Sequence, residues 1–489
     1  MLFQPEQSYT KLSPLLASSC APTPVAEPQW IAFNQALANS LGLPAELHNT
    51  EQGLLLFAGN QLPKWAQPHA LAYAGHQFAN FVPQLGDGRA LLLTEVLDKN
   101  QQRFDIQLKG AGRTPYSRGG DGRSAIGPVL REYIVSEAMH ALNIPTTRAL
   151  AAVATGEAVQ RETAQPGAIL TRVASSHLRV GTAQYVLGLK RYDLLKQFAD
   201  YVIQRHYPSA AEAANPYLEL LNQVIDKQAQ LIAKWMSVGF IHGVMNTDNM
   251  TLSGETIDYG PCAFMEAYNP AQKFSYIDRR GRYAYQNQPP IAMWNLARYA
   301  ETLLPLLTET DNDTEQAIQV ATAAVEGFES VYHGYYEQAM ATKIGHGHKA
   351  SEPVTQQLLE RLLHLMQQQQ VDFTLAFRYL GDTDSSRFIE LFSQDTTSAK
   401  NWYQDWLASH NDSKPTVVKQ AMNQVNPAVI PRNHRLEEVI QAAQNSGDLR
   451  PFNRFVQALQ QPFEERQEFA EFMQPAKPSE QVTTTFCGT

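Results

Sequence analysis

The stretch that decides the fold reads His242-Gly243-Val244-Met245-Asn246-Thr247-Asp248-Asn249 and continues as Ile257-Asp258-Tyr259-Gly260. It places an Asp-Asn pair in one loop and a second Asp in the turn that follows. Enzymes that transfer a nucleotide phosphate need such groups, because hard oxygen atoms bind magnesium and one carboxylate orients or deprotonates the nucleophile. The alternative is that two Asx-rich turns flank a short strand over residues 250–252.

Protein kinases use the same three groups, namely a catalytic-loop Asp, a metal-binding Asn and the Asp of an Asp-Phe-Gly turn. In this chain Gly243 and Val244 follow His242, so the His-Arg-Asp signature of kinases is missing. The similarity therefore lies in the chemistry of the site and not in its usual sequence.

Two further elements of a kinase site are indicated upstream. Residues 104–109 alternate apolar and polar side chains, which predicts a strand that ends at Lys109. Residues 127–139 begin with Gly-Pro and carry apolar side chains at helical spacing, which predicts a helix. A strand Lys paired with a helix Glu holds the phosphate-binding ammonium of kinases, and Glu132 is the expected partner. Glu137 on the same helix is an alternative partner. A further alternative is that the lysine and the glutamate are separate surface charges that form no ion pair.

Glycines interrupt the chain on both sides of Lys109. Residues 83–93 contain Gly86 and Gly88 between apolar runs, which predicts a hairpin whose bare backbone can approach a phosphate. Asp-Gly is also common in plain hairpin turns, so this signal is weak. Residues 118–124 form a second glycine-rich loop with two arginines, suited to an anion contact or to a mobile loop. Neither segment fits a Walker pattern, and Gly110-Ala111-Gly112 fails the dinucleotide fingerprint because Pro115 occupies the third glycine position.

These motifs together resemble the selenoprotein O family of pseudokinases. The match is carried by residues 84–89, 109–118 and 246–260, and the stretches 73–78 and 278–285 also fit. The resemblance covers essentially the whole chain. It implies an α+β, bilobal, protein-kinase-like fold that transfers AMP from ATP to protein hydroxyls. Bacterial relatives in this family are also described as transferring UMP with manganese.

The resemblance assigns roles to individual residues. It implies that Asp248 is the proton acceptor, that Asn249 and Asp258 hold Mg²⁺ or Mn²⁺, and that Glu132 pairs with Lys109. The family binds ATP in a flipped orientation, which presents the α-phosphorus to the acceptor. The nucleotide contacts that it implies are Gly86, Gly88, Arg89, Lys109, Asp121, Gly122, Arg172, Arg179 and Asp258.

The cations in this set suit adenylyl transfer. The reaction expels pyrophosphate, and Lys109, Arg172, Arg179 and a metal can neutralise the charge that builds on that leaving group. Arg172 lies in an apolar strand, residues 168–174, so a structural salt bridge is a competing interpretation. Arg179 could equally be solvated.

The C-terminus reads Thr485-Phe486-Cys487-Gly488-Thr489. Eukaryotic members of the family carry selenocysteine near this place, so the resemblance implies a redox role for Cys487. Cys262 and Cys20 are candidate partners, and an exposed terminal thiol without function is the alternative. Three cysteines leave at least one unpaired and do not indicate a disulfide-built fold.

Composition agrees with a cytoplasmic enzyme, and we expect no membrane and no nucleic-acid partner. The net charge of −9 argues against general nucleic-acid binding. No apolar run approaches the ~20 residues that a membrane span requires, and the N-terminus lacks the pattern of a secretory signal. The oligomeric state stays open.

The organisation follows from the pattern of elements. We expect an N-terminal extension over residues 1–60, with a helix near residues 30–41. A strand-rich N-lobe over 61–180 and a helical C-lobe with the catalytic loop over 181–345 should follow. A helical region over 346–474 and a mobile tail with Cys487 over 475–489 complete the chain.

The resemblance, together with these motifs, implies a protein adenylyltransferase that uses ATP as co-substrate and modifies Ser, Thr or Tyr hydroxyls of protein substrates, with UTP as a further donor. An ordinary phosphotransferase would use the same residues on the γ-phosphate. A catalytically silent nucleotide-binding scaffold is the third hypothesis, although a silent site has no need of Lys109, Asp248, Asn249 and Asp258 together.

Overall fold

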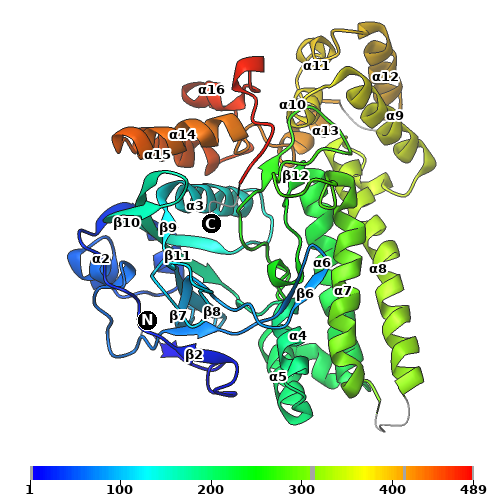
Figure 1. Cartoon of the computed structure of the whole chain (residues 1–489). Coiled ribbons are helices and arrows are strands. Elements are labelled where there is room, and N and C mark those ends of the chain that lie inside the picture. The colour runs from blue at the N-terminus through cyan, green and yellow to red at the C-terminus, as the bar shows by residue number, and fades with distance from the viewer. Residues whose placement is uncertain (1–3, 309–313, 411–414, 487–489) are drawn as a thin grey trace.

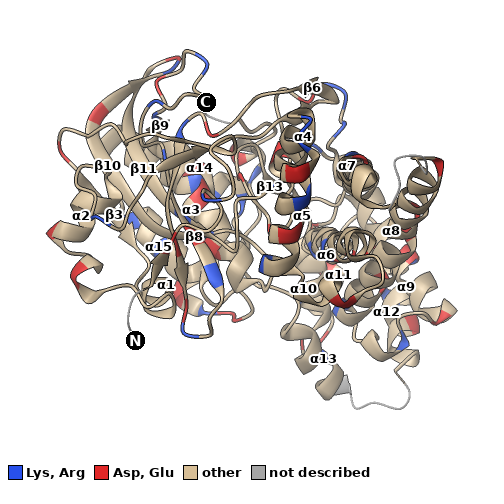
Figure 2. Cartoon of the chain, turned by 90° about the horizontal axis from the view of Figure 1, so that it is seen from below, with Lys and Arg blue, Asp and Glu red and all other residues tan. Residues whose placement is uncertain are grey.

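The computed structural model describes residues 4–308, 314–410 and 415–486. It is a mixed α/β protein with one large antiparallel sheet and many helices (Figure 1). Seen from below, the sheet lies on one side of the molecule and helices α6, α7 and α8 lie on the other (Figure 2). No helix in the described part of the chain is long and apolar enough to cross a membrane.

The large sheet has the strand order β2-β4-β7-β8-β11-β10-β3, with β1 beside β7 and β9 beside β11. Its neighbours run antiparallel, and the first 60 residues supply β1, β2 and β3. Two short sheets, β5-β6 and β12-β13, lie apart from it. The strands are β1 Pro5–Glu6, β2 Ala17–Ser19, β3 Gln29–Phe33, β4 His69–Leu71, β5 Gly75–Gln77, β6 Asn80–Val82, β7 Ala90–Leu97, β8 Arg103–Lys109, β9 Ser124–Ala125, β10 Arg148–Gln160, β11 Ala164–Ala174, β12 Phe240–Ile241 and β13 Ala263–Phe264.

Apolar cores cover both faces of the sheet. Along β7, Leu92 belongs to the core shared with the helical half, whereas Leu91 and Leu93 belong to a second core with α1 and α2. This split follows from the alternation of side chains along a strand. Nearly every residue of β7 is buried because both faces are covered.

The helices after the sheet pack mainly on one another. In Figure 1, α6, α7 and α8 run side by side, and α14 and α15 lie over α3. The α-helices are α1 Gln35–Ser40, α2 Glu51–Phe57, α3 Ile126–Ala141, α4 Val180–Gly188, α5 Tyr192–His206, α6 Pro216–Ser237, α7 Gln288–Leu303, α8 Thr314–Lys343, α9 Pro353–Gln369, α10 Phe373–Leu380, α11 Ser386–Glu390, α12 Thr396–Ala408, α13 Pro415–Asn423, α14 Asn433–Ser446, α15 Arg450–Leu459 and α16 Ala470–Met473.

Helix α3 is buried on almost every side. One side of it packs on β10 and β11 of the sheet, and the outer side is covered by α14 and α15. On that outer side Tyr133 stacks edge-on against Phe452, with ring centroids 5.5 Å apart. The helix is therefore held from two directions, which fixes the position of the residues that it carries toward the cleft.

Several predicted elements are confirmed, two are wrong, and one alternative is excluded. The strand ending at Lys109 and helix α3 both occur. Residues 30–41 form β3 and the short helix α1 instead of one helix. Residues 83–89 form an open loop between β6 and β7, since β6 pairs with β5 and β7 pairs with β8. Residues 250–252 form no strand, and Thr251 makes an isolated bridge to Arg179.

Candidate active site

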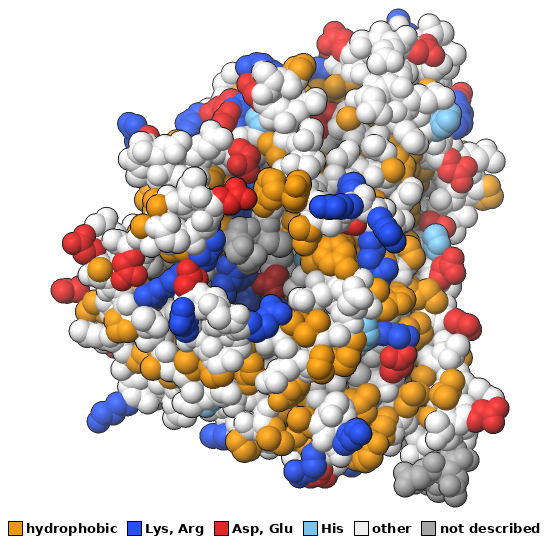
Figure 3. Space-filling view, viewed as in Figure 1, with side chains coloured by type: hydrophobic (Ala, Val, Ile, Leu, Met, Phe, Trp, Pro, Cys, Tyr) orange, Lys and Arg blue, Asp and Glu red, His pale blue; other side chains and the backbone are white. Residues whose placement is uncertain are grey.

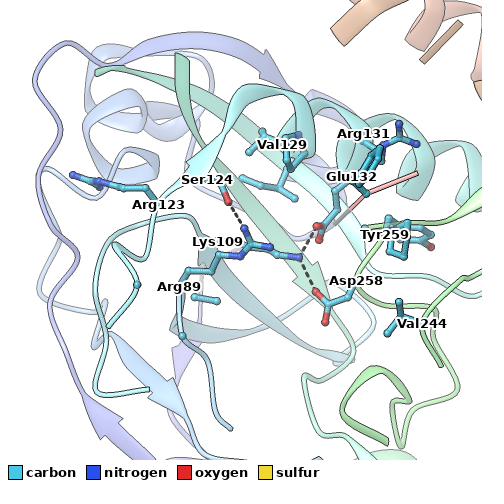
Figure 4. A pocket seen from close by; sticks show the side chains of 18 of the residues that line it. Arg89, Lys109, Arg123, Ser124, Val129, Arg131, Glu132, Val244, Asp258 and Tyr259 are labelled. Carbon is cyan, nitrogen blue, oxygen red and sulfur yellow. Dashed lines mark hydrogen bonds and ion pairs between the residues drawn. The ribbon is translucent and has the colours of Figure 1, made fainter. Parts of the chain in front are cut away.

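Lys109 lies at the end of β8, where the register places it opposite Ala90 of β7 and Leu170 of β11. Its Nζ lies 2.6 Å from Glu132 Oε2 on α3 and 2.6 Å from Asp258 Oδ1 (Figure 4). Glu137 does not compete for the lysine, because it pairs with Arg148 at 2.7 Å. The structure thus brings the predicted Lys-Glu pair together and adds Asp258 to it.

Asp258 is the centre of a cluster of three cations. Arg172 Nη1 lies 2.8 Å from its Oδ1, and Arg179 Nη1 lies 2.7 Å from its Oδ2. Burial would raise the pKa of this carboxyl, but Lys109, Arg172 and Arg179 outweigh burial and hold the pKa well below its usual range. Asp258 is therefore an anion that already has three partners before any nucleotide enters the cleft.

Arg172 is fully buried, as its place in an apolar strand requires. It also contacts Glu132 Oε1 at 3.1 Å, and its Nη2 donates to Gln107 Oε1 at 2.7 Å from the neighbouring strand β8. The salt bridge that sequence offered as a competing interpretation is thus present, and it lies inside the candidate site. Arg179 is buried as well, with its guanidinium 4.7 Å from the centre of the Tyr73 ring, so it is not solvated.

Asp248 lies in the 3-10 turn Thr247–Asn249 and is 8% exposed. Its Oδ2 accepts a hydrogen bond from Gln77 Nε2 at 3.3 Å, and its Oδ1 has no hydrogen-bond partner among the described residues. Burial raises the pKa of Asp248 to about 6, against the opposing field of Arg179. A buried carboxylate with a free oxygen and a pKa near neutrality is suited to accepting a proton.

The residues near Asp248 fit a nucleotide-bound divalent cation. Asn249 Nδ2 donates to the Val244 carbonyl at 2.9 Å, and no described residue bonds to the Asn249 amide oxygen. That oxygen and the Asp258 carboxylate are hard ligands of the kind that Mg²⁺ prefers, with substrate phosphates completing the shell. No cluster of three or more His, Cys, Asp or Glu side chains suited to a metal occurs in the described residues. Such a cation would therefore depend on the nucleotide for its remaining ligands.

The predicted glycine loops border the same cavity, which has a volume of about 960 Å³. Gly86 has a φ of +80°, and a Cβ at this position would overlap the Tyr116 ring. Gly122 has a φ of +69°, and a Cβ there would overlap the Gly112 carbonyl. Only glycine fits both constraints without displacement of the neighbouring chain.

The other predicted contacts also line the cavity, although each already has a partner. Gly88 and Arg89 lie at its wall, and Arg89 Nη1 donates to Ser124 Oγ at 3.2 Å (Figure 4). Asp121 lies at the rim, where Arg161 holds it at 2.8 Å and lowers its pKa. In the space-filling view, blue side chains gather around the central hollow (Figure 3).

Sequence reasoning left several cavity residues without a role. Tyr73 and Gln77 come from a motif that signalled the family but suggested no chemistry. Glu437 and Gln444 reach the cavity from α14, which lies far beyond α3 in the sequence, and no local pattern could place them there. Phe486 is a further lining residue from the C-terminal tail.

The described part of the tail is attached beside the site, although its composition predicts mobility. The Thr485 N–H donates to the Phe274 carbonyl at 2.8 Å, and the Phe486 ring packs at a tilt against Tyr276, with ring centroids 5.1 Å apart. Cys487 lies outside the described residues, so its redox role stays a prediction. Cys262 is buried, directly after Pro261, whose carbonyl accepts a hydrogen bond from Thr485 Oγ1.

Comparison with known proteins gives one consistent result. A family model described as "Protein adenylyltransferase SelO" matches residues 3–460. The chain is 53% identical over 491 residues to the protein nucleotidyltransferase YdiU of Rhodopseudomonas palustris (strain ATCC BAA-98 / CGA009), a match that covers 99% of both chains. It is 52% identical over 490 residues to the protein of the same name from Rhizobium rhizogenes (strain K84 / ATCC BAA-868), covering 99% of this chain and 96% of that protein.

Proposed function

Because the chain belongs to the SelO family of protein adenylyltransferases, we propose that it transfers AMP from ATP to Ser, Thr or Tyr hydroxyls of other proteins. The chain is thus a nucleotidyltransferase, with ATP as co-substrate and a divalent cation as cofactor. Transfer of UMP from UTP is a further part of the proposal.

The observation that carries the proposal is the cation cluster on Asp258. Lys109, Arg172 and Arg179 converge on one carboxylate in a buried part of the cavity. Charges fixed in a water-poor site stabilise a developing anion without reorganising at the moment of reaction. Such a cluster suits pyrophosphate, the leaving group of adenylyl transfer. The β- and γ-phosphates would lie on these cations, and the α-phosphorus would face the acceptor side.

Asp248 supplies the base in this scheme. Its unpartnered Oδ1 would accept the proton of the acceptor hydroxyl as the hydroxyl oxygen attacks the α-phosphorus. The Arg179 guanidinium fixes the backbone of this loop, since its Nη1 donates to the Asp248 carbonyl at 2.6 Å. The bond from the α-phosphorus to the bridging oxygen then breaks, and pyrophosphate leaves.

Asn249 and Asp258 would hold the Mg²⁺ or Mn²⁺ ion, through the Asn249 amide oxygen and one Asp258 carboxylate oxygen. A bound divalent cation would supply charge neutralisation on the phosphate oxygens. For this, the Asp258 carboxylate must first be released from Lys109, Arg172 and Arg179. Nucleotide phosphates would take over Lys109 and the two arginines, which frees the carboxylate for the metal.

The arrangement of the chain supports a bilobal, kinase-like organisation. The sheet carries the phosphate-binding Lys109, α3 carries Glu132, and the loop with Asp248 follows α6 in the helical half. We therefore propose lobes at residues 61–180 and 181–345, with the helical region 346–474 bracing α3 from outside through α14 and α15. Because the reaction consumes ATP, we place the protein in the cytoplasm.

Labelled ATP tests the proposal directly. The protein is incubated with Mg²⁺ or Mn²⁺, a bacterial lysate as acceptor, and ATP labelled at either the α- or the γ-phosphorus. We expect protein-bound label from the α-position only, with a mass increase that matches AMP, and far less label with Asp248→Asn. Label from the γ-position would instead make the chain a kinase. Nucleotide binding without label from either position, with either metal, would favour the silent scaffold.

A further inference from the structure

Residues 276–282 form a compact turn next to the loop that carries Asp248. The Asp278 carboxylate accepts hydrogen bonds from the backbone N–H groups of Arg282 and Tyr283, at 2.9 and 2.8 Å. On the other side of the turn, Lys273 Nζ donates hydrogen bonds to the Asp278 and Arg279 carbonyls. Side chains that project from this turn therefore start from a fixed backbone.

The turn is joined to the catalytic loop through Tyr283. Its hydroxyl donates to Asn246 Oδ1 at 2.7 Å, two residues before Asp248. Burial is the main cause that raises the pKa of Tyr283 to about 12, and the Asp248 carboxylate is near enough to contribute to the shift. A segment of another protein that lies across this turn would thus pass close to the proposed base.

Arg282 is held in place as a cation without an acidic partner. Its guanidinium lies 5.0 Å from the Trp294 ring centre and 5.7 Å from the Tyr283 ring centre. Its Nε is buried and makes no hydrogen bond to a described residue. Trp294 in turn packs against His76, whose backbone N–H donates to Thr247 Oγ1 at 2.7 Å. A guanidinium oriented by two rings and without a carboxylate partner among the described residues is suited to binding an anion.

The neighbouring arginines extend this charge. Arg279 and Arg280 are exposed, and neither they nor Arg282 form an ion pair with a carboxylate of the described residues. The chain as a whole has 48 acidic and 39 basic side chains and is therefore negatively charged. Three arginines within four residues, none with a carboxylate partner among the described residues, make this turn locally positive. Tyr276 and Ile277 lie beside them and are 58% and 57% exposed. In Figure 3, basic and hydrophobic side chains together border the central hollow.

We propose that this acceptor surface, defined as Tyr276, Ile277, Arg279, Arg280 and Arg282, binds an acidic segment of the protein that is to be modified. The segment carries Asp or Glu within a few residues of the acceptor hydroxyl, and an apolar side chain that packs on Tyr276 and Ile277. The inference rests on the proposed function, because it names the class of acceptor that the same site selects. Opposite charges on two partners guide both encounter and choice of partner.

A charge swap tests the acceptor surface. The sites that carry AMP are mapped by mass spectrometry after the parent protein and Arg282→Glu have each modified a bacterial lysate. Parent sites should be enriched in Asp and Glu near the acceptor hydroxyl, and sites of the variant should shift toward Lys and Arg. Lys99→Glu is the matched control, because Lys99 is an exposed lysine in the β7-β8 turn that changes net charge by the same amount. The control should keep the acidic preference.

Peptides make the test quantitative. With Ser-containing peptides that differ only in Asp, Asn or Lys beside the serine, the parent should favour Asp over Asn by at least about threefold in kcat/KM, the range of exposed ion pairs. The preference should weaken as salt is raised. The affinity of Arg282→Glu for ATP should equal that of the parent in calorimetry.

The outcomes separate the two proposals. Absence of AMP on any peptide or lysate protein would refute the proposed function and this inference with it. Transfer that ignores the flanking charge, or that keeps its preference in Arg282→Glu, would overturn the acceptor surface alone. Stronger inhibition by a single-stranded oligonucleotide than by the Asp peptide would assign the surface to nucleic acid and also overturn it.

Discussion

Arg179 and Asp258 form the contact that ties the two halves of the candidate site together. The Arg179 Nη1 that lies 2.7 Å from Asp258 Oδ2 also donates to the Asp248 carbonyl, at 2.6 Å. One buried guanidinium thus fixes the loop of the proposed base and competes with any metal for the Asp258 carboxylate. Metal binding and nucleotide binding should therefore be coupled, because phosphates must draw the cations away before the carboxylate is free.

Asp258→Asn should separate these two effects. Without metal, the variant should bind ATP more tightly than the parent, by about tenfold, on the order of 1 kcal/mol, because the phosphates no longer compete with a carboxylate for three cations. With Mg²⁺, the variant should gain no further affinity and should transfer no AMP. Calorimetric titration of ATP in chelator and in Mg²⁺ measures both.

The control for this experiment is Asp193→Asn, which neutralises an exposed aspartate outside the cavity. It should behave as the parent does under both conditions. An Asp258→Asn variant that loses ATP affinity in chelator would show that the carboxylate does not compete with phosphate.

Substitutions of Lys109 and of Glu132 should differ in how strongly they lower ATP affinity and turnover. Lys109→Met removes a charge from the phosphate site, so both ATP affinity and turnover should fall, with turnover lower by at least about tenfold. Glu132→Gln should give a milder loss, because Asp258 still holds the lysine and Gln107 still holds Arg172. Single-turnover transfer from α-labelled ATP, together with calorimetry, distinguishes the variants. Normal binding and transfer by Lys109→Met would make this lysine dispensable.

The buried Asp248 predicts a pH dependence of activity. The base must be ionised to accept a proton, and burial raises its pKa to about 6. Turnover should therefore rise as the pH increases through about 6 and then level off. Asp248→Asn should lower turnover by on the order of 10²–10⁴ at pH 7.5 and leave ATP binding near the parent value.

Stability should change in the opposite sense from activity. The pKa of Asp248 is higher in the folded than in the unfolded chain, so ionisation costs folding free energy above pH 6. That cost shrinks as the pH falls from 6 toward 4, where both states become protonated. Asp248→Asn should raise Tm at pH 7.5 and raise it less at pH 4.5. An equal shift at both pH values would contradict the assignment of this pKa.

Much of the fold could be predicted where the signal is local. The alternation over residues 104–109 predicts β8, and Gly-Pro followed by helical spacing predicts α3. Residues 30–41 mislead because Trp30 and Ile31 fit either a strand or a helix. Pairing of β3 with β10, more than 100 residues away, decides in favour of the strand. The prediction of a hairpin around the loop 83–89 is wrong for the same reason, because the strands on either side of this loop pair with other strands.

The candidate site follows a similar rule. Lys109, Glu132, Asp248 and Asp258 are recognisable because each belongs to a motif with known chemistry. The convergence of Arg172 and Arg179 on Asp258 could not be read from the sequence, because it depends on the register of β11 against β8 and on the positive φ of Asp258, +64°. The contribution of α14 to the cavity depends on packing against α3, which no local pattern encodes.

Gln77 should act as a positioning residue for the base. It makes the one side-chain hydrogen bond that the Asp248 carboxylate receives from the described residues, at 3.3 Å. Burial raises the pKa of Asp248, and the Gln77 bond lowers it. Gln77→Ala should therefore move the midpoint of the acidic limb of the rate profile to higher pH. Gln77→Glu should move it further, because a second carboxylate disfavours ionisation of the first.

The effect of Gln77→Ala should depend on pH in a way that a purely structural defect would not reproduce. Near pH 6 its turnover should fall by about threefold to tenfold, within the range of one ordinary hydrogen bond. At pH 8.5, where Asp248 is ionised in both proteins, turnover should recover toward the parent value. ATP affinity should stay unchanged throughout. Asn80→Ala, at the exposed start of β6 in the same hairpin, is the matched control and should leave the profile where it is. A uniform loss at every pH in Gln77→Ala would mean that Gln77 supports the fold of the hairpin and does not tune the base.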